Sequence, residues 1–76
     1  MYYVYILKCP DKTYYTGCTH DLEDRMKRHN LGQIHYTKTR LPVKLHSYVA
    51  FSDKYKAYDF ERYLKSGNKR LFTDKF

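Results

Sequence analysis

The sequence predicts an α+β fold in which three strands form an antiparallel-type sheet with helices packed on it, in the order β-β-α-β-α. Three runs rich in aromatic and β-branched residues, 2–8, 13–17 and 43–51, are typical of strands. Two further runs, after the second and third of these, repeat an apolar residue every three or four positions, as amphipathic helices do. At 76 residues the chain predicts a single domain over residues 1–76.

The first two strands are expected to pair as a hairpin. Residues 2–8 contain no strand-breaking residue, and Pro-Asp-Lys at 10–12 has the composition of a turn. Residues 13–17 then form the second strand, which we expect Gly17 to end. Two β-rich runs separated by a short turn are the usual sequence signal of a hairpin.

The first helix is expected to begin after a cap at Thr19 or Asp21 and to run to about Asn30. Gly32 lies just past its end, where glycine commonly closes a helix. Residues 31–42 show no strong periodicity, so we expect a polar and basic loop before the third strand.

The second helix is expected after the Ser-Asp pair at 52–53, to run through about residues 65–66 and to be closed by Gly67. The basic tail follows from residue 68. We expect its apolar side chains to pack back against the domain; these are Leu71, Phe72 and Phe76.

The charge of the chain points to an anionic partner. Fifteen Lys and Arg against eight Asp and Glu give a net charge of +7, and a phosphate polymer is the natural partner of such a surface. Charge alone does not separate nucleic-acid binding from simple solubility. No run approaches the ~20 apolar residues of a membrane span, and the first residues lack a secretory pattern. We therefore expect a cytoplasmic protein that does not bind membranes.

The two cysteines, Cys9 and Cys18, are expected to be semi-buried free thiols. Disulfides are rare in the cytosol. A structural zinc site needs four ligands, and His20 is the only candidate near the cysteines to add to them.

The first helix carries two residues of chemical interest. At about 100° per residue, Leu22, Met26 and His29 fall on one stripe, and Arg25 lies about 60° to its side. A histidine on an apolar stripe is more often a satisfied core residue than a catalyst. For Arg25 the plain alternative is an exposed ion pair, for instance with Asp21.

The second helix places a carboxylate at the border of its apolar stripe. Ala57, Phe60 and Leu64 form that stripe, and Glu61 sits beside it. A carboxylate there is costly unless it meets a cation or a metal ion. The plain alternative is an ion pair with Lys65 or with a residue of the first helix.

In order and spacing, these residues resemble the GIY-YIG nuclease family, which is named after two tripeptides. Tyr3-Val4-Tyr5 stands in place of the first, and Tyr15-Thr16-Gly17 follows after nine residues in place of the second. The pattern Asp-Leu-x-x-Arg-x-x-x-His-Asn at 21–30 and Glu-Arg-x-x-Lys-x-Gly at 61–67 complete a match that covers about residues 2–67. The likeness is to small single-domain members, and the chain is similar to the N-terminal nuclease module of the bacterial excision-repair endonuclease.

The resemblance implies a metal-dependent endonuclease that hydrolyses phosphodiester bonds in DNA, in repair or recombination, with RNA left open as a substrate. It implies catalytic roles for Tyr5, Tyr15, Arg25 and His29 and assigns Glu61 as the ligand of one Mg²⁺ or Mn²⁺ ion. Arg25 would grip the phosphate bidentately, and either Tyr5 or His29 would be the general base.

Other readings remain open at this stage. The asparagine often found near the end of the family domain has only Asn68 as a candidate. A non-catalytic domain could use the same basic surface to bind phosphates, through Lys38, Arg40, Lys44, Lys69 and Arg70. A nuclease subunit that needs a larger protein partner is a third reading, and the sequence leaves the oligomeric state open.

Overall fold

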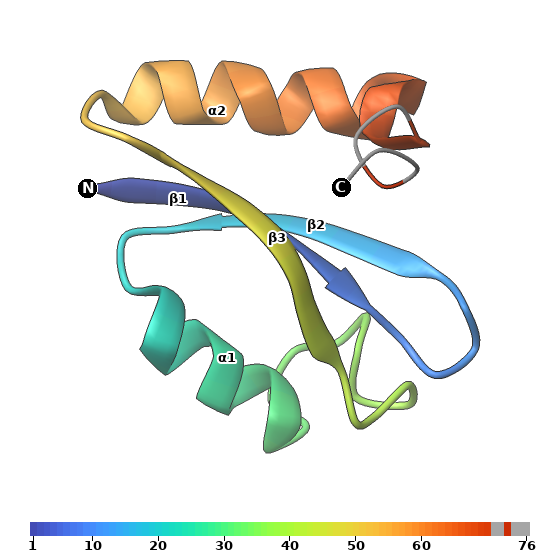
Figure 1. The fold of residues 1–76 in the computed structure, drawn as a ribbon. Coiled ribbons are helices and arrows are strands. Elements are labelled where there is room, and N and C mark those ends of the chain that lie inside the picture. Colours follow the sequence, from blue (N-terminus) through green and yellow to red (C-terminus); the bar gives the residue numbers. More distant parts are fainter. Residues whose placement is uncertain (71–72, 74–76) are drawn as a thin grey trace.

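The computed structural model describes residues 1–70 and 73. Its elements in chain order are β1 (Tyr2–Lys8), β2 (Tyr14–Thr19), α1 (Leu22–Asn30), β3 (Lys44–Phe51), α2 (Lys54–Tyr63) and the kinked segment η1 (Leu64–Asn68). Figure 1 shows α1 and α2 on opposite sides of the twisted sheet. The α+β class and the β-β-α-β-α order predicted from the sequence are confirmed. The predicted packing of Leu71, Phe72 and Phe76 lies outside the described residues.

The sheet has three antiparallel strands in the order β2-β1-β3, so β1 is central and β2 is an edge strand. Tyr5 of β1 pairs with Gly17 of β2 and with Tyr48 of β3. At the end of β1, Lys8 pairs with Lys44 of β3 after a register irregularity. The hairpin between β1 and β2 was predicted; the placement of β3 on the other side of β1 follows only from the structure.

Each face of the sheet has its own small core because successive side chains of β1 point to opposite faces. The cluster beneath α2 is formed by Val4, Ile6, Ala57 and Leu64. The cluster on the α1 side is formed by Tyr5, Leu7, Cys9 and Val43, with Leu22 and Met26 of α1 packed against it. Residues of β1 supply half of each buried set, so the central strand positions both helices.

Local signals set the helix bounds. The Asp21 carboxylate accepts a hydrogen bond from the Asp24 amide at 3.0 Å and caps α1, so Asp21 rather than Thr19 is the cap. Asp53 caps α2 through the Tyr55 amide at 2.8 Å. Gly67 has a φ of +102°, the left-handed conformation that ends helices. In residues 1–70 and 73, no helix has the length and hydropathy needed to cross a membrane.

Gly17 does not end the second strand, so that prediction was wrong. The strand continues to Thr19, and Gly17 lies inside it, opposite Tyr5. A Cβ atom at Gly17 would collide with the phenol end of the Tyr5 ring. Glycine is therefore required here because the Tyr5 ring lies directly against the β2 backbone.

Candidate active site

The centre of the candidate site is a buried contact between Tyr5 of β1 and His29 of α1. The phenol oxygen of Tyr5 lies 3.0 Å from Nε2 of His29, and both residues have 0% exposed surface. The missing side chain of Gly17 leaves room for the Tyr5 ring to extend over the edge strand. Two residues that the sequence placed at the site are thus in direct contact.

Thr37 completes this hydrogen-bonded chain. Its hydroxyl lies 2.7 Å from Nδ1 of His29 and 3.5 Å from the carbonyl oxygen of Ile34, to which it donates. We therefore assign the Nδ1–H tautomer of His29, in which Nδ1–H donates to Thr37 and Nε2 accepts the Tyr5 proton. Sequence reasoning missed this role, because Thr37 lies in a loop without periodicity and its partner is eight residues away.

Burial keeps both members of the pair neutral. It lowers the pKa of His29 to about 4, and the positive charge of Arg25 acts in the same direction. Burial likewise raises the pKa of Tyr5 to about 12, with a further rise from Tyr15, while Arg25 opposes the shift through its charge and a hydrogen bond. Near neutral pH, Tyr5 is a phenol and His29 an uncharged acceptor for its proton.

Tyr15 packs beside this pair, with its ring tilted against Tyr5 and edge-on to His29, and is half-buried. Its ring centroid lies 5.2 Å from that of His29 and 6.3 Å from that of Tyr5. On its other side, the ring of Tyr36 lies at 5.2 Å, so an aromatic row leads from the buried pair to the exposed Tyr36.

Arg25 and Glu61, from helices on opposite faces of the sheet, both act electrostatically on residues of β1 and β2. Arg25 belongs to α1 and Glu61 to α2. Burial and then the charge of Glu61 raise the pKa of the Cys18 thiol in β2, whereas the charge of Arg25 lowers it. Both charges also act on Tyr5. The candidate cation and carboxylate thus both influence the pKa values of Tyr5 and Cys18.

Glu61 forms the ion pair that was its alternative to a site role, whereas Arg25 does not, among the described residues, form the ion pair considered for it. Glu61, whose side chain is 21% exposed, pairs with Nζ of Lys65 at 3.1 Å, as that alternative predicted. For Arg25, no ion pair with Asp21 occurs within residues 1–70 and 73, and Asp21 caps α1 instead. Arg25 is half-buried and lies close enough to the Tyr5–His29 pair to influence the pKa of both residues.

The side chains at the site are suited to a divalent ion that keeps most of its ligands from water and substrate. Within the described part of the chain, no three His, Cys, Asp or Glu side chains gather into a metal-binding group, and Cys9 and Cys18 are free. A closed zinc site is therefore not formed by these residues. Mg²⁺, by contrast, is commonly held by one or two carboxylates with water and substrate phosphate as the other ligands. Glu61 fits that mode when its carboxylate leaves the ion pair with Lys65 and binds the metal ion instead.

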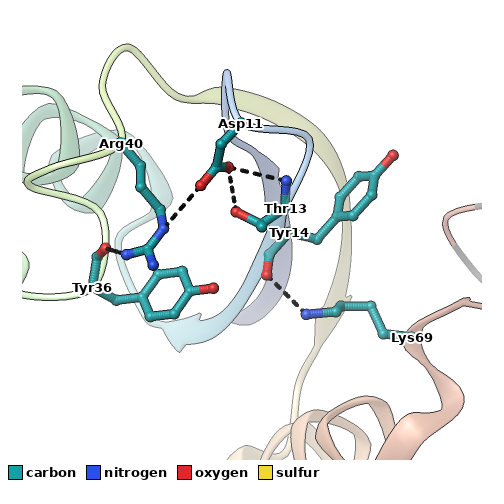
Figure 2. Close-up of polar contacts among 6 residues, drawn as sticks. All are labelled: Asp11, Thr13, Tyr14, Tyr36, Arg40 and Lys69. Atoms are coloured by element: carbon teal, nitrogen blue, oxygen red, sulfur yellow. Dashed lines mark hydrogen bonds and ion pairs between the residues drawn. The ribbon is translucent and has the colours of Figure 1, made fainter.

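Two of the basic residues predicted to bind nucleic acid are engaged within the fold (Figure 2). Lys69 donates from Nζ to the carbonyl oxygen of Tyr14 at 2.9 Å. Arg40 donates to Asp11 at 3.2 Å and to the carbonyl oxygen of Tyr36, and its guanidinium lies 4.3 Å from the centre of the Tyr36 ring. These contacts tie the tail and the loop to the β1–β2 hairpin.

The other predicted contacts are more open to solvent. Lys38, Lys44 and Arg70 are exposed. The Asn68 side chain donates to the carbonyl oxygen of Tyr63 at 3.1 Å and so stabilises the end of α2. Lys69 and Arg40 are therefore held by contacts within the domain, whereas Lys38 and Lys44 are exposed.

Comparison with known proteins identifies a family and several relatives that this chain resembles. The chain matches the GIY-YIG catalytic domain over residues 1–75. It is 52% identical over 65 residues to the UPF0213 protein YsiG of Lactococcus lactis, covering 84% of this chain and 62% of that protein. It is 50% identical over 66 residues to the UPF0213 protein CPE1444 of Clostridium perfringens, covering 86% and 71% respectively. The aligned part thus spans less than two thirds of the Lactococcus protein.

A solved structure supports the same fold. The chain is similar to the solution NMR structure of the UPF0213 protein BH0048 from Bacillus halodurans, with a TM-score of 0.61 and 38% sequence identity. The similarity covers 97% of this chain and 81% of that one. The aligned region thus takes in nearly the whole chain.

Proposed function

The chain belongs to the GIY-YIG catalytic domain family, and on that premise we propose that it is a divalent-metal-dependent endonuclease that hydrolyses phosphodiester bonds in DNA at a single site. The observation that carries the proposal is the buried Tyr5–His29 hydrogen bond, with Arg25 acting on both residues. A domain that only binds phosphates does not need a buried histidine that can accept the proton of the Tyr5 phenol. We propose DNA repair or recombination as the setting.

Arg25 is the residue proposed to hold the scissile phosphate. Its guanidinium is permanently charged and presents a fork that matches two phosphate oxygens. Because it acts on the Tyr5 phenol through charge and a hydrogen bond, a phosphate held by Arg25 would lie next to that phenol. Its positive charge would stabilise the negative charge that develops on the phosphate in the transition state.

Tyr5 and His29 are proposed to share the role of general base. The water oxygen bonds to phosphorus while the bond from phosphorus to the leaving oxygen breaks. The water proton passes to the Tyr5 oxygen, the Tyr5 proton passes to Nε2 of His29, and the leaving oxygen takes a proton from water. The 3.0 Å separation allows this second transfer. The relay needs no free phenolate, which the raised pKa of Tyr5 would make scarce. Thr37 keeps Nδ1 protonated and Nε2 open to receive the proton.

Glu61 is proposed to provide the protein ligand for one Mg²⁺ or Mn²⁺ ion, with the remaining ligands from water and the substrate. When bound, such an ion neutralises charge on the phosphate and on the leaving oxygen. Glu61 is held at the border of the α2 stripe with most of its side chain shielded. Lys65, its present partner, is exposed enough to turn towards solvent or the substrate.

The test is nicking of supercoiled plasmid DNA with Mg²⁺ or Mn²⁺, beside a Glu61→Gln variant and a chelator control. A matched control is Asp59→Asn, which neutralises a 75%-exposed carboxylate of the same helix. We expect nicking by the wild type and by Asp59→Asn, and none by Glu61→Gln or with chelator. Nicking that survives Glu61→Gln would contradict the proposed metal ligand. Binding without nicking would support a non-catalytic domain or a nuclease that needs a protein partner. The same assay with an RNA substrate would show whether the protein cleaves DNA, RNA or both.

A further inference from the structure

A cavity lies away from the Tyr5–His29 pair, at the end of the sheet where the β1–β2 turn meets the start of β3. It has a volume of about 520 Å³. Its lining combines three lysines with two prolines and a cysteine, namely Lys8, Lys12, Lys44, Pro10, Pro42 and Cys9. A concave surface with three cationic side chains and no carboxylate in its lining is suited to an anion.

The strand register places like charges side by side at this cavity. Lys8 of β1 is paired directly with Lys44 of β3. Like charges directly opposite each other destabilise an antiparallel pair. Within residues 1–70 and 73, neither these two lysines nor Lys12 takes part in an ion pair. The fold therefore carries a local charge repulsion that a bound anion would relieve.

The carboxylate closest in sequence, Asp11, is used elsewhere. It accepts hydrogen bonds from the amide and the hydroxyl of Thr13, at 3.1 and 2.5 Å, and from Nε of Arg40 at 3.2 Å. These bonds, drawn in Figure 2, join the hairpin turn to the loop that precedes Pro42. Asp11 thus connects the two walls of the cavity and is already occupied by donors other than the three lysines.

The turn itself is held in a defined shape. The Lys12 amide donates to the carbonyl oxygen of Cys9 at 3.0 Å, and the Cys9 amide donates to that of Thr13 at 2.9 Å. Lys12 adopts a φ of +69°, a conformation that non-glycine residues rarely take. If folding alone decided the residue at position 12, Gly or Asn would be expected there, because both tolerate a positive φ. The cavity is therefore preorganised around a cationic residue.

From these observations we propose that Lys8, Lys12 and Lys44 form a binding site for backbone phosphates of the nucleic-acid substrate, separate from the site of cleavage. The identity of the ligand rests on the proposed function. Lys8 lies three residues beyond Tyr5 in β1, which is about 10 Å along a strand. That length corresponds to about three base pairs of duplex at 3.4 Å each. Because Tyr5 and Lys8 point to opposite faces of the sheet, a duplex that meets both sites would pass around the end of the sheet, where the lysines would fix its register on the protein.

The test compares two triple variants with the same loss of charge. The first is Lys8→Gln with Lys12→Asn and Lys44→Gln, in which Asn suits the positive φ of residue 12. The control is Lys27→Gln with Lys54→Gln and Lys56→Gln, all exposed residues outside the cavity. Affinity for a fluorescent DNA duplex is measured with chelator at several salt concentrations, and circular dichroism confirms that both variants are folded.

The expected result is a fall in the salt slope, the change of log affinity with log salt, by about 1 to 3 for the cavity variant and by less than 1 for the control. At 0.1 M salt the cavity variant is expected to bind at least about tenfold more weakly than the control. Equal losses in the two variants, or a wild type that binds no DNA, would overturn the inference. Because this assay needs no cleavage, cavity-dependent binding by a chain that nicks nothing would uphold the site while refuting the nuclease.

Discussion

The phenol oxygen of Tyr5 and Nε2 of His29 are 3.0 Å apart in the interior of the domain, and neither residue is exposed. Tyr5 comes from the central strand and His29 from the last turn of α1, so the contact also joins sheet and helix. One hydrogen bond thereby links the packing of α1 to the proposed proton transfer. Changes to either residue are therefore expected to alter both folding and catalysis.

The dependence of cleavage on pH separates a proton relay from a free phenolate base. If Tyr5 passes its proton to neutral His29, kcat should be nearly constant between about pH 6 and 9, because the pKa values of about 4 and 12 lie outside this range. If the phenolate of Tyr5 were required, log kcat would rise by about one for each pH step over the same range. Nicking rates at saturating plasmid, in buffers matched for ionic strength, distinguish the two.

Stability should fall in mild acid because of His29. Its pKa is about 4 in the folded protein and 6.5 as the ordinary value, so the unfolded chain binds more protons between these values. The stability present above pH 6.5 is therefore lost as the pH falls towards 4, by at most about 3 kcal/mol. Urea unfolding at pH 7 and 4.5 measures this loss. His20→Gln, at an exposed position, should retain it and His29→Gln should lack most of it.

NMR titration of the wild type tests the same pKa shift of His29 even if the His29→Gln variant does not fold. In the wild type, the imidazole signals of His29 should show no titration between pH 7 and 5.5 in NMR spectra. A midpoint near the ordinary value would show that the ring is accessible to water, and it would contradict the buried neutral histidine on which the relay depends.

Sequence patterns predicted most of the fold because local preferences decide most of it. The runs of aromatic and β-branched residues, the caps at Asp21 and Asp53 and the closing Gly67 are all local signals, and each agrees with the structure. The error at Gly17 has a non-local cause. A glycine that makes room for a side chain of the neighbouring strand looks, in sequence, like one that ends a strand.

The site was predicted in part for the same reason. The helical wheel places His29 on the buried stripe of α1, and it is fully buried. Its partner Thr37 belongs to a loop whose path no periodicity predicts, so the tautomer of His29 could not be derived from sequence. Likewise, no sequence pattern indicated the hydrogen bonds by which Lys69 and Arg40 hold the hairpin, and their binding of phosphate stays a prediction.

Thr37→Val should weaken the domain by removing one hydroxyl at nearly constant size. Nδ1–H of His29 would lose its buried acceptor, which costs about 1–3 kcal/mol. The histidine would also be free to adopt the other tautomer, so kcat should fall more than DNA affinity. Urea unfolding and nicking kinetics measure both effects. Thr39→Val, at an exposed position two residues on, is the matched control, and an equal effect there would remove the special role of Thr37.

Gly17→Ala should destabilise the sheet because the new Cβ would collide with the Tyr5 phenol. Overpacking of this kind commonly costs about 1–3 kcal/mol. Tyr5→Phe removes the hydroxyl, the atom nearest to that Cβ, so the double variant should lose less than the sum of the two single losses. Unfolding free energies of all four proteins complete the cycle. Additive losses would mean that the collision comes from the ring carbons, which Phe retains, and not from the hydroxyl.

Arg25 allows the last prediction, which separates charge from shape. Arg25→Ala should abolish nicking while the domain stays folded, because the charge that would hold the phosphate is lost. Arg25→Lys keeps the charge but not the two-pronged donor, so it should retain weak cleavage. Since the charge of Arg25 helps to lower the pKa of His29, that pKa should rise in Arg25→Ala and stay low in Arg25→Lys. NMR titration of His29 reads this effect independently of cleavage. Normal turnover by Arg25→Ala would show that the phosphate is held elsewhere.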